Sequence, residues 1–181
     1  MDRKEIEASL AKCGDYVKID FLMRVLKQTG LDMDTKKFAM LKLSGIYEER
    51  KMFLESARLM RLVADFEPTD LGRITDLVKS GQLYVQGGAL QESEISFAKA
   101  LALAFTEQQK DKIKSTRNET YKSQAKYFLQ REKRKHAMDI YEALLRFDMP
   151  FEEKKRIQQE LLVLYNKLGK VDDYFDLKRK M

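Results

Sequence analysis

A pattern of large and small residues in the middle of the chain constrains the fold more than any other feature of the sequence. Its members are Leu77, Gly81, Tyr84, Ser93 and Phe97. Small residues let two helix backbones approach closely, and large residues fill the space between neighbouring helix pairs. Gly87-Gly88 interrupts the pattern and permits a sharp turn. The sequence therefore predicts two antiparallel helices packed against each other over residues 74–107.

Weaker copies of this pattern lie on both sides of the first. The copy at 38–71 carries Leu41, Gly45, Ala57 and Ala64. The copy at 118–151 carries Tyr121, Ala125, Phe128, Ala137 and Tyr141. Two further hairpins are expected at the ends of the chain, over about 1–30 and 155–181. The chain is therefore predicted to be a single domain, 1–181, built from five helical hairpins.

The spacing of the copies indicates irregular repeats. The equivalent small-residue positions are Ile19, Ala57, Ser93, Ala137 and Tyr174, which are 38, 36, 44 and 37 residues apart. This arrangement resembles the tetratricopeptide repeat (TPR), whose copies follow one another at about 34 residues. The resemblance implies an all-α fold, a TPR-like α-solenoid in which antiparallel hairpins stack into a right-handed superhelix of about ten helices.

Composition agrees with an all-helical chain. Charged residues make up 35% of the sequence and alternate with apolar residues at intervals of three and four, which is the pattern of amphipathic helices. Pro68 and Pro150 fall between predicted hairpins, where they do not interrupt a helix. Helix starts are expected at four places with capping side chains. These are Asp15, Asp32 or Asp34, Thr69 or Asp70, and Thr106.

Several features predict a soluble, cytoplasmic protein. No apolar stretch approaches the roughly 20 residues that span a bilayer. The charged N-terminus is not followed by a signal-type hydrophobic segment. Cys13 is the only cysteine, so it cannot form an internal disulfide, and we expect a half-buried packing residue.

The inventory of reactive side chains argues against an enzyme. The chain holds one histidine and one cysteine, too few for a metal site of the His/Cys type. His136 lies in a basic run and is expected to be a solvated residue at a helix start. Gly87-Gly88 lacks the further glycines and the lysine of a phosphate loop. We therefore expect no catalytic, cofactor or metal site.

Positive charge is concentrated in one segment, residues 106–136. It holds ten basic and four acidic residues, and the difference of six equals the formal net charge of the whole chain, +6. Such a stripe could bind an acidic peptide, a nucleic-acid backbone or an anionic membrane surface, or it could be a solvated helix face. Few aromatic residues accompany it, which disfavours nucleic acid.

The resemblance to tetratricopeptide repeats also implies a binding surface. In that family the first helix of each hairpin lines a concave groove that receives a peptide. Carried onto this sequence, the groove residues are Lys42, Ile46, Glu49, Arg50, Lys79, Gln82, Val85, Gln86, Lys122, Lys126 and Leu129. The leading hypothesis is a non-catalytic protein-binding module or scaffold whose partner is a protein or peptide, expected to be acidic. The alternative is a nucleic-acid-binding helical-repeat protein that uses the 106–136 segment.

Overall fold

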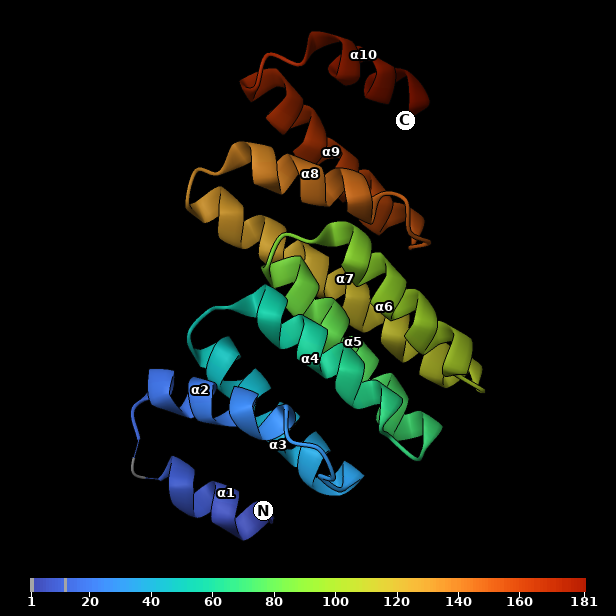
Figure 1. The fold of residues 1–181 in the computed structure, drawn as a ribbon. Coiled ribbons are helices and arrows are strands. Elements are labelled where there is room, and N and C mark those ends of the chain that lie inside the picture. Colours follow the sequence, from blue (N-terminus) through green and yellow to red (C-terminus); the bar gives the residue numbers. More distant parts are fainter. Residues whose placement is uncertain (1, 12) are drawn as a thin grey trace. The chain divides into compact units, whose positions relative to one another are not determined.

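The computed structural model describes residues 2–11 and 13–181 (Figure 1). Within these residues the chain forms ten helices, which hold 80% of the chain, and no strand. The prediction of an all-α chain with about ten helices is confirmed. The helices form two compact units, residues 1–113 and 114–181, and each is described by itself. No helix in the described part combines the length and the apolar character that crossing a membrane requires.

Six complete helices belong to unit 1. They are α1 (Arg3–Leu10), α2 (Asp15–Leu26), α3 (Met33–Glu49), α4 (Phe53–Asp65), α5 (Asp70–Gln86) and α6 (Leu90–Leu103). From α2 to α6 each helix contacts the next one in the chain, and α1 also contacts α3. The following helix, α7 (Glu107–Gln130), begins in unit 1 and ends in unit 2.

Side-chain caps fix several helix starts. Asp32 accepts a hydrogen bond from the Thr35 amide at 2.8 Å, and Thr69 and Thr106 each accept one from the amide three residues further on, at 3.1 and 3.2 Å. These hydrogen bonds satisfy amides that have no partner inside a helix. The predicted starts at these residues are confirmed. Asp15 is instead the first residue of α2, and the glycine before it occupies the cap position.

The predicted close approach of α5 and α6 is present. The Ser93 hydroxyl donates to the Gly81 carbonyl oxygen at 2.9 Å, and both residues are buried. A Cβ atom added to Gly81 would lie 2.7 Å from the ring of Phe97. Only glycine fits at this position, because the ring fills the space that any side chain would need.

The equivalent contact between α3 and α4 uses serines. The hydroxyl oxygens of Ser44 and Ser56 lie 2.8 Å apart, and the Ser56 hydroxyl lies 3.0 Å from the Ser44 carbonyl oxygen, to which it can donate. Each serine stands 37 residues before its counterpart, Gly81 or Ser93. Both hydroxyls are buried, and both have a hydrogen-bond partner, so the small polar side chains carry no unsatisfied group into the interface.

The register predicted for the copy at 38–71 is therefore wrong by one residue. Leu41 is 39% exposed, whereas its neighbour Met40 is 6% exposed and takes the position of Leu77. A Cβ atom on Gly45 would have no neighbour within 4 Å, so this glycine is not at a close approach. The prediction favoured Leu41 and Gly45 because their residue types match the pattern better than methionine and serine do.

One turn recurs in four hairpins. A residue in the left-handed conformation follows each odd-numbered helix from α3 to α9: Lys51, Gly88, Glu132 and Gly169, with φ of 59°, 80°, 57° and 69°. The amide of the next residue then donates, at 2.8 to 2.9 Å, to the carbonyl of an aromatic residue five positions earlier. Those aromatic residues are Tyr47, Tyr84, Phe128 and Tyr165. This geometry is the Schellman motif, and the left-handed residues are 37, 44 and 37 positions apart.

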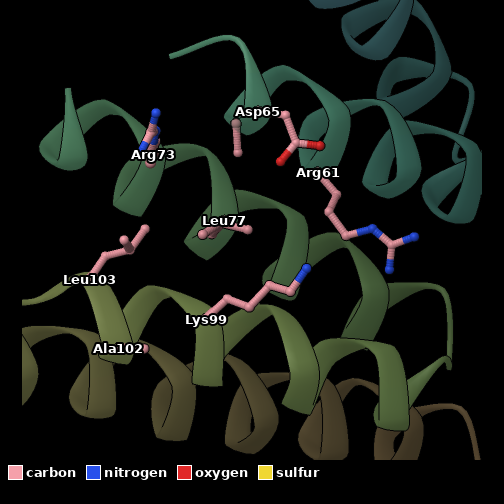
Figure 2. Close-up of a pocket in the computed structure, with 8 residues that line it drawn as sticks. Arg61, Asp65, Arg73, Leu77, Lys99, Ala102 and Leu103 are labelled. Carbon is pink, nitrogen blue, oxygen red and sulfur yellow. The ribbon is translucent and has the colours of Figure 1, made fainter. Parts of the chain in front are cut away.

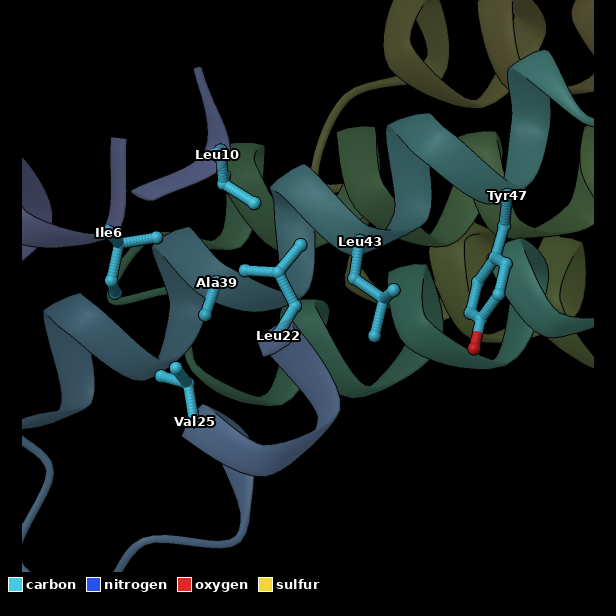
Figure 3. Close-up of a cluster of buried hydrophobic side chains, with 7 residues drawn as sticks. All are labelled: Ile6, Leu10, Leu22, Val25, Ala39, Leu43 and Tyr47. Carbon is cyan, nitrogen blue, oxygen red and sulfur yellow. The ribbon is translucent and has the colours of Figure 1, made fainter. Parts of the chain in front are cut away.

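The core of the N-terminal part joins α1, α2 and α3 (Figure 3). Its buried members are Ile6, Leu10, Leu22, Val25, Ala39, Leu43 and Tyr47. The spacing of Ala39, Leu43 and Tyr47 places them along one stripe of α3. Leu41, Lys42 and Gly45, on the neighbouring face of α3, are exposed, and they line the candidate site described below.

Unit 2 comprises the rest of α7 with α8 (Arg134–Leu144), α9 (Phe151–Lys167) and α10 (Val171–Lys180). The fully buried Tyr121 meets Phe147 edge to face, with ring centroids 5.2 Å apart, and the Arg117 guanidinium lies 3.7 Å from the Phe147 ring. The Tyr165 hydroxyl donates to Glu142 at 2.9 Å and links α9 to α8. By contrast, α10 has no buried residue.

Candidate binding groove

A groove of about 480 Å³ lies between α1, α2 and α3. We call it the α1–α3 groove. The lining residues are Glu7, Leu10, Ala11, Lys18, Leu41, Lys42, Gly45, Ile46 and Glu49. Three of them, Lys42, Ile46 and Glu49, are residues that the sequence placed in a binding groove. The structure brings these three together on one side of α3.

Helical spacing explains why α3 lines the groove. Lys42, Ile46 and Glu49 follow one another at four and three residues, so their side chains leave the helix in similar directions. Gly45 lies beside them and has no side chain, and the space around its Cβ position is empty to 4 Å. The groove is open at this point because the position holds a glycine. Leu41 lies one turn earlier, 39% exposed, and adds an apolar surface.

Charges in the groove nearly balance. Lys42 Nζ lies 3.3 Å from a Glu7 carboxylate oxygen, which ties α3 to α1 across the groove. Lys18 Nζ lies 3.6 Å from Asp15. Glu49 adds a second carboxylate to the lining, and it is exposed. The polar part of the groove therefore offers both signs of charge beside the apolar surface of Leu10, Leu41 and Ile46.

Arg50, the fourth residue predicted from this copy, faces a different neighbour. It caps the C-terminus of α3, and its guanidinium carbon lies 3.9 Å from the centre of the Tyr16 ring. A guanidinium nitrogen also lies 3.5 Å from Asp15. Arg50 thus joins the end of α3 to the start of α2, and it does not line the groove.

The predicted residues on α5 divide between surface and core. Lys79 Nζ forms a 2.6 Å ion pair with Glu48 of α3, in which both side chains are partly exposed. Gln82 is partly exposed and Gln86 is exposed, so both can meet a ligand. Val85 is 0% exposed. It lies four residues after Gly81 on the packed stripe of α5, so it contributes to the interior and not to a groove surface.

The predicted residues on α7 lie in unit 2. Lys122 pairs with Glu119 on its own helix and, at 2.8 Å, with Glu153 of α9. Desolvation lowers the pKa of Lys122, but the hydrogen bonds and charges of the two glutamates outweigh it, and the net pKa is raised. Lys126 is exposed and Leu129 is partly buried. Lys42, Lys79 and Lys122 therefore each have a carboxylate on another odd-numbered helix.

Part of the basic 106–136 segment is also committed to internal contacts. Arg117 is 8% exposed, so it is not part of a charged surface. Arg131 places its guanidinium 4.1 Å from the Tyr127 ring. Lys133, Arg134 and Lys135 are exposed where α8 begins. His136 follows them on the first turn of α8 and is exposed as expected, with its ring 5.1 Å from that of Phe128.

Sequence reasoning missed the α1 and α2 side of the groove. The lining residues on this side are Glu7, Leu10, Ala11 and Lys18. The residue pattern in this region predicted a helical hairpin but did not indicate which of its residues contact α3. It also assigned Leu41 and Gly45 to packing. One signal was available: Leu41, Gly45 and Glu49 recur at four-residue intervals, as residues on one face of a helix do.

The side chains that line the groove are charged or aliphatic. Its lining offers carboxylates, ammonium groups and aliphatic surface, with no imidazole, thiol or hydroxyl group. In the part of the chain that the structure describes, no three His, Cys, Asp or Glu side chains gather as a metal site would require. Cys13 is half-buried, as predicted. Comparison of the sequence with protein-family models and with curated proteins found no match.

Proposed function

We propose that the chain is a non-catalytic protein-binding module of the tetratricopeptide type, whose hairpins stack in a right-handed superhelix. In this proposal a segment of a partner protein lies on α3 and α5 and enters the α1–α3 groove. Lys42, Ile46 and Glu49 are its first contacts, with Gly45 leaving room for a partner side chain.

The recurrent turn supports the repeat part of the proposal. Four hairpins have a residue in the left-handed conformation at the same position of the turn. They also share the hydrogen bond to the carbonyl of an aromatic residue, although their sequences at the turn differ. Repeated hairpins of one geometry are the units from which helical solenoids are built. Such solenoids bind their partners along extended surfaces made from equivalent positions of successive repeats.

The observation that carries the binding part is the α1–α3 groove itself. It combines an opening of about 480 Å³ with exposed apolar surface and charges of both signs. A volume of this order accepts one or two side chains of a peptide. Ala39, Leu43 and Tyr47, on the neighbouring stripe of α3, are buried in the core, and Ile46 packs against that core, which holds the groove side of the helix in place.

The ion pairs refine the expected chemistry of the partner. An acidic partner was expected because the predicted groove residues are net basic. Lys42 and Lys79 already face Glu7 and Glu48, so a partner carboxylate must displace an internal one to reach them. We therefore propose a segment that inserts an apolar side chain beside Gly45 and meets Lys42 and Glu49 with polar groups of either sign.

A display experiment tests this function. A random-peptide phage library selected on the full chain should enrich peptides that share an apolar anchor residue. Their affinity should fall about tenfold or more in Gly45→Phe, because the new ring fills the groove. The matched control is Gln91→Phe, which adds the same ring at an exposed position of α6. Equal binding by wild type and Gly45→Phe, or no enrichment, would rule the proposal out.

A nucleic-acid-binding function remains the second candidate because Lys133, Arg134 and Lys135 are consecutive and exposed. Phosphate binding weakens steeply with salt, since each neutralised phosphate releases counterions. Retention on immobilised nucleic acid should then decline with salt and be lost in the double variant Arg134→Glu and Lys135→Glu. Retention that is absent at low salt would exclude this candidate.

A further inference from the structure

A second pocket of about 480 Å³ lies between α4, α5 and α6 (Figure 2). We call it the α4–α6 pocket. Its floor is apolar and includes Ala64 and Leu77, which are 3% and 6% exposed, together with the partly buried Leu103. Its rim is charged. A pocket that combines the two can hold an apolar side chain while its rim holds polar groups on either side of it.

This pocket uses a different face of α5 from the one proposed above. Leu77 lies two residues before Lys79 and nine before Gln86. At about 100° per residue, these separations place Leu77 about 160° and 180° around the helix from the two surface residues. A ligand in the α4–α6 pocket therefore meets none of the residues assigned to the α1–α3 groove or to the outer face of α5.

Two of the rim cations lack a counter-ion among the residues that the structure describes. Among the residues described, neither Arg61 nor Lys99 has a carboxylate oxygen within 4.0 Å, and the Arg61 guanidinium lies 6.0 Å from the Tyr84 ring. Arg73, by contrast, contacts oxygen atoms of neighbouring residues. Its Nε donates to the Glu67 carbonyl at 2.9 Å, and Nη1 lies 3.5 Å from Asp70.

The charged groups are arranged along the pocket. In Figure 2 the charged ends of Arg61 and Lys99 lie toward the same end, Arg73 lies toward the other, and Leu77 is between them. Arg61 comes from α4 and Lys99 from α6, so the two helices supply one positive charge each. Asp65 is the acidic member of the rim and is exposed.

We propose that the α4–α6 pocket binds an acidic segment of a partner protein. An apolar side chain of the segment packs on Leu77 and Leu103, and its carboxylates pair with Arg61 and Lys99. The uncompensated charges make this pocket complementary to an acidic ligand, which the nearly balanced α1–α3 groove is not. This second site is independent of the proposed function, since the two share no residue.

A polypeptide fits the pocket better than a nucleic acid does. The apolar floor offers nothing to a phosphate backbone, and Asp65 on the rim repels a continuous polyanion. The described lining contains no aromatic residue on which a base could stack. An acidic peptide can instead place an apolar residue over the floor and direct its carboxylates away from Asp65.

Fluorescence anisotropy with two labelled peptides tests the proposal. One peptide alternates glutamate with leucine, and the other alternates glutamate with serine at the same charge. The full chain should bind the leucine peptide about tenfold or more tightly than the serine peptide, because only the leucine peptide buries apolar surface. The double variant Arg61→Glu and Lys99→Glu should lose at least about tenfold in affinity for the leucine peptide.

Matched variants separate this site from a diffuse charge effect. Lys4→Glu with Lys112→Glu makes the same change in net charge at exposed positions outside the pocket, and it should weaken binding about twofold or less. Ala102→Phe keeps every charge and fills the pocket, so it should weaken binding as the Arg61 and Lys99 pair does. Thermal melts check that each variant is folded.

Three results would overturn the proposal. They are the absence of binding by the wild type, equal losses in the two charge-reversal pairs, and full binding by Ala102→Phe. Equally tight binding of a single-stranded oligonucleotide of the same charge would assign the cations to nucleic acid instead. Gly45→Phe should leave this peptide's affinity unchanged, so that failure here and failure of the proposed groove are told apart.

Discussion

The hairpin of α3 and α4 and the hairpin of α5 and α6 have the same architecture and different residues at its tightest contact. In α5/α6 a glycine backbone lies against a phenylalanine ring, and Ser93 donates to Gly81. In α3/α4 two serines exchange hydrogen bonds at the equivalent place. In the same way, α4 carries Met60 at the position where α6 carries Phe97. A smaller side chain on one helix is matched by a larger one on its partner, so packing volume is conserved while residue type is not.

This comparison gives the two helix glycines opposite roles. Gly81 is a packing residue because any Cβ would meet Phe97 at 2.7 Å. Gly45 has open space around it and lies in the α1–α3 groove. A pattern search treats the two as equivalent because both are glycines eight residues into a hairpin. The structure separates them by one position of register.

The largest expected effect comes from placing the same side chain at both glycines. Gly81→Leu should lower the free energy of unfolding by about 1–3 kcal/mol or more, because the side chain forces α5 and α6 apart. Gly45→Leu should leave it unchanged or raise it by up to about 1 kcal/mol, since leucine favours the helix more than glycine does. Urea denaturation of both variants measures the difference. Similar losses at the two positions would contradict the register.

A partly buried carboxyl group also distinguishes the two hairpins. Asp76 of α5 stands where α3 has the fully buried Ala39, and its Oδ2 has no hydrogen-bond partner among the described residues. Burial, with a smaller contribution from Glu67 that outweighs nearby Lys37, raises the pKa of Asp76 from 3.8 to about 6. The folded state then holds this proton more tightly than the unfolded chain, so this group's contribution to stability falls as pH rises from about 4 to 6.

Asp76→Asn therefore should stabilise the protein at pH 7.5 by about 1 kcal/mol, a figure reduced from the full pKa shift because the group is partly exposed. At pH 4 the gain should nearly vanish, because the wild-type carboxyl is then protonated in the folded state. Asp65→Asn removes the same charge at an exposed position of α4 and is the control. Melting temperatures across this range provide the measurement, and a gain that is constant with pH would contradict the assignment.

These two hairpins also show what the sequence could reveal. The all-helical fold, the helix pair at 74–107 and its turn at Gly88 were predicted because their residue types are nearly obligatory for the geometry. The register of α3 and α4 was not predicted correctly. Serine is small enough for the close contact, but it also occurs at many other positions, so its presence does not mark the contact. Val85 was assigned to a surface and is buried, since neighbouring positions on one helix differ by only 100°.

The groove itself was less predictable than the fold. The residues on its α3 side were implied by the resemblance to tetratricopeptide repeats, but its α1 side depends on which residues of a distant helix pack nearby. The ion pairs could not be predicted for the same reason, because each joins two helices that are distant in sequence. Lys42 and Glu7 are 35 positions apart, and Lys79 and Glu48 are 31 positions apart. A count of charges along the sequence shows an excess of lysine in the predicted groove and does not show which lysines are already paired.

The recurrent turn provides a smaller test of the same comparison. Lys51 and Gly88 occupy the same left-handed position, which costs a residue with a side chain about 1 kcal/mol. Lys51→Gly should therefore raise the free energy of unfolding by about 0.5–1 kcal/mol, and Gly88→Ala should lower it by a similar amount. Chemical denaturation should show the two shifts with opposite signs, and shifts of the same sign would mean that the turns are not equivalent.

The smallest effect is expected from the ion pair between Lys79 and Glu48. Lys79→Glu places two carboxylates together and should cost about 0.5 kcal/mol, since both side chains are partly exposed. The swap Lys79→Glu with Glu48→Lys should recover most of that loss. A double-mutant cycle measures the coupling. A coupling of zero would show that Lys79 is free to meet a ligand, and the acidic partner expected from the sequence would regain support.

Nuclear magnetic resonance mapping tests the central claim most directly. The ¹H–¹⁵N spectrum of the full chain is recorded during titration with the tightest-binding peptide from the display selection. We expect the largest shifts at the amides of Lys42, Gly45, Ile46 and Glu49, with smaller shifts in α1 around Glu7. Shifts concentrated at Arg131 to Lys135, with the α3 amides unmoved, would contradict the account and place binding on the basic segment.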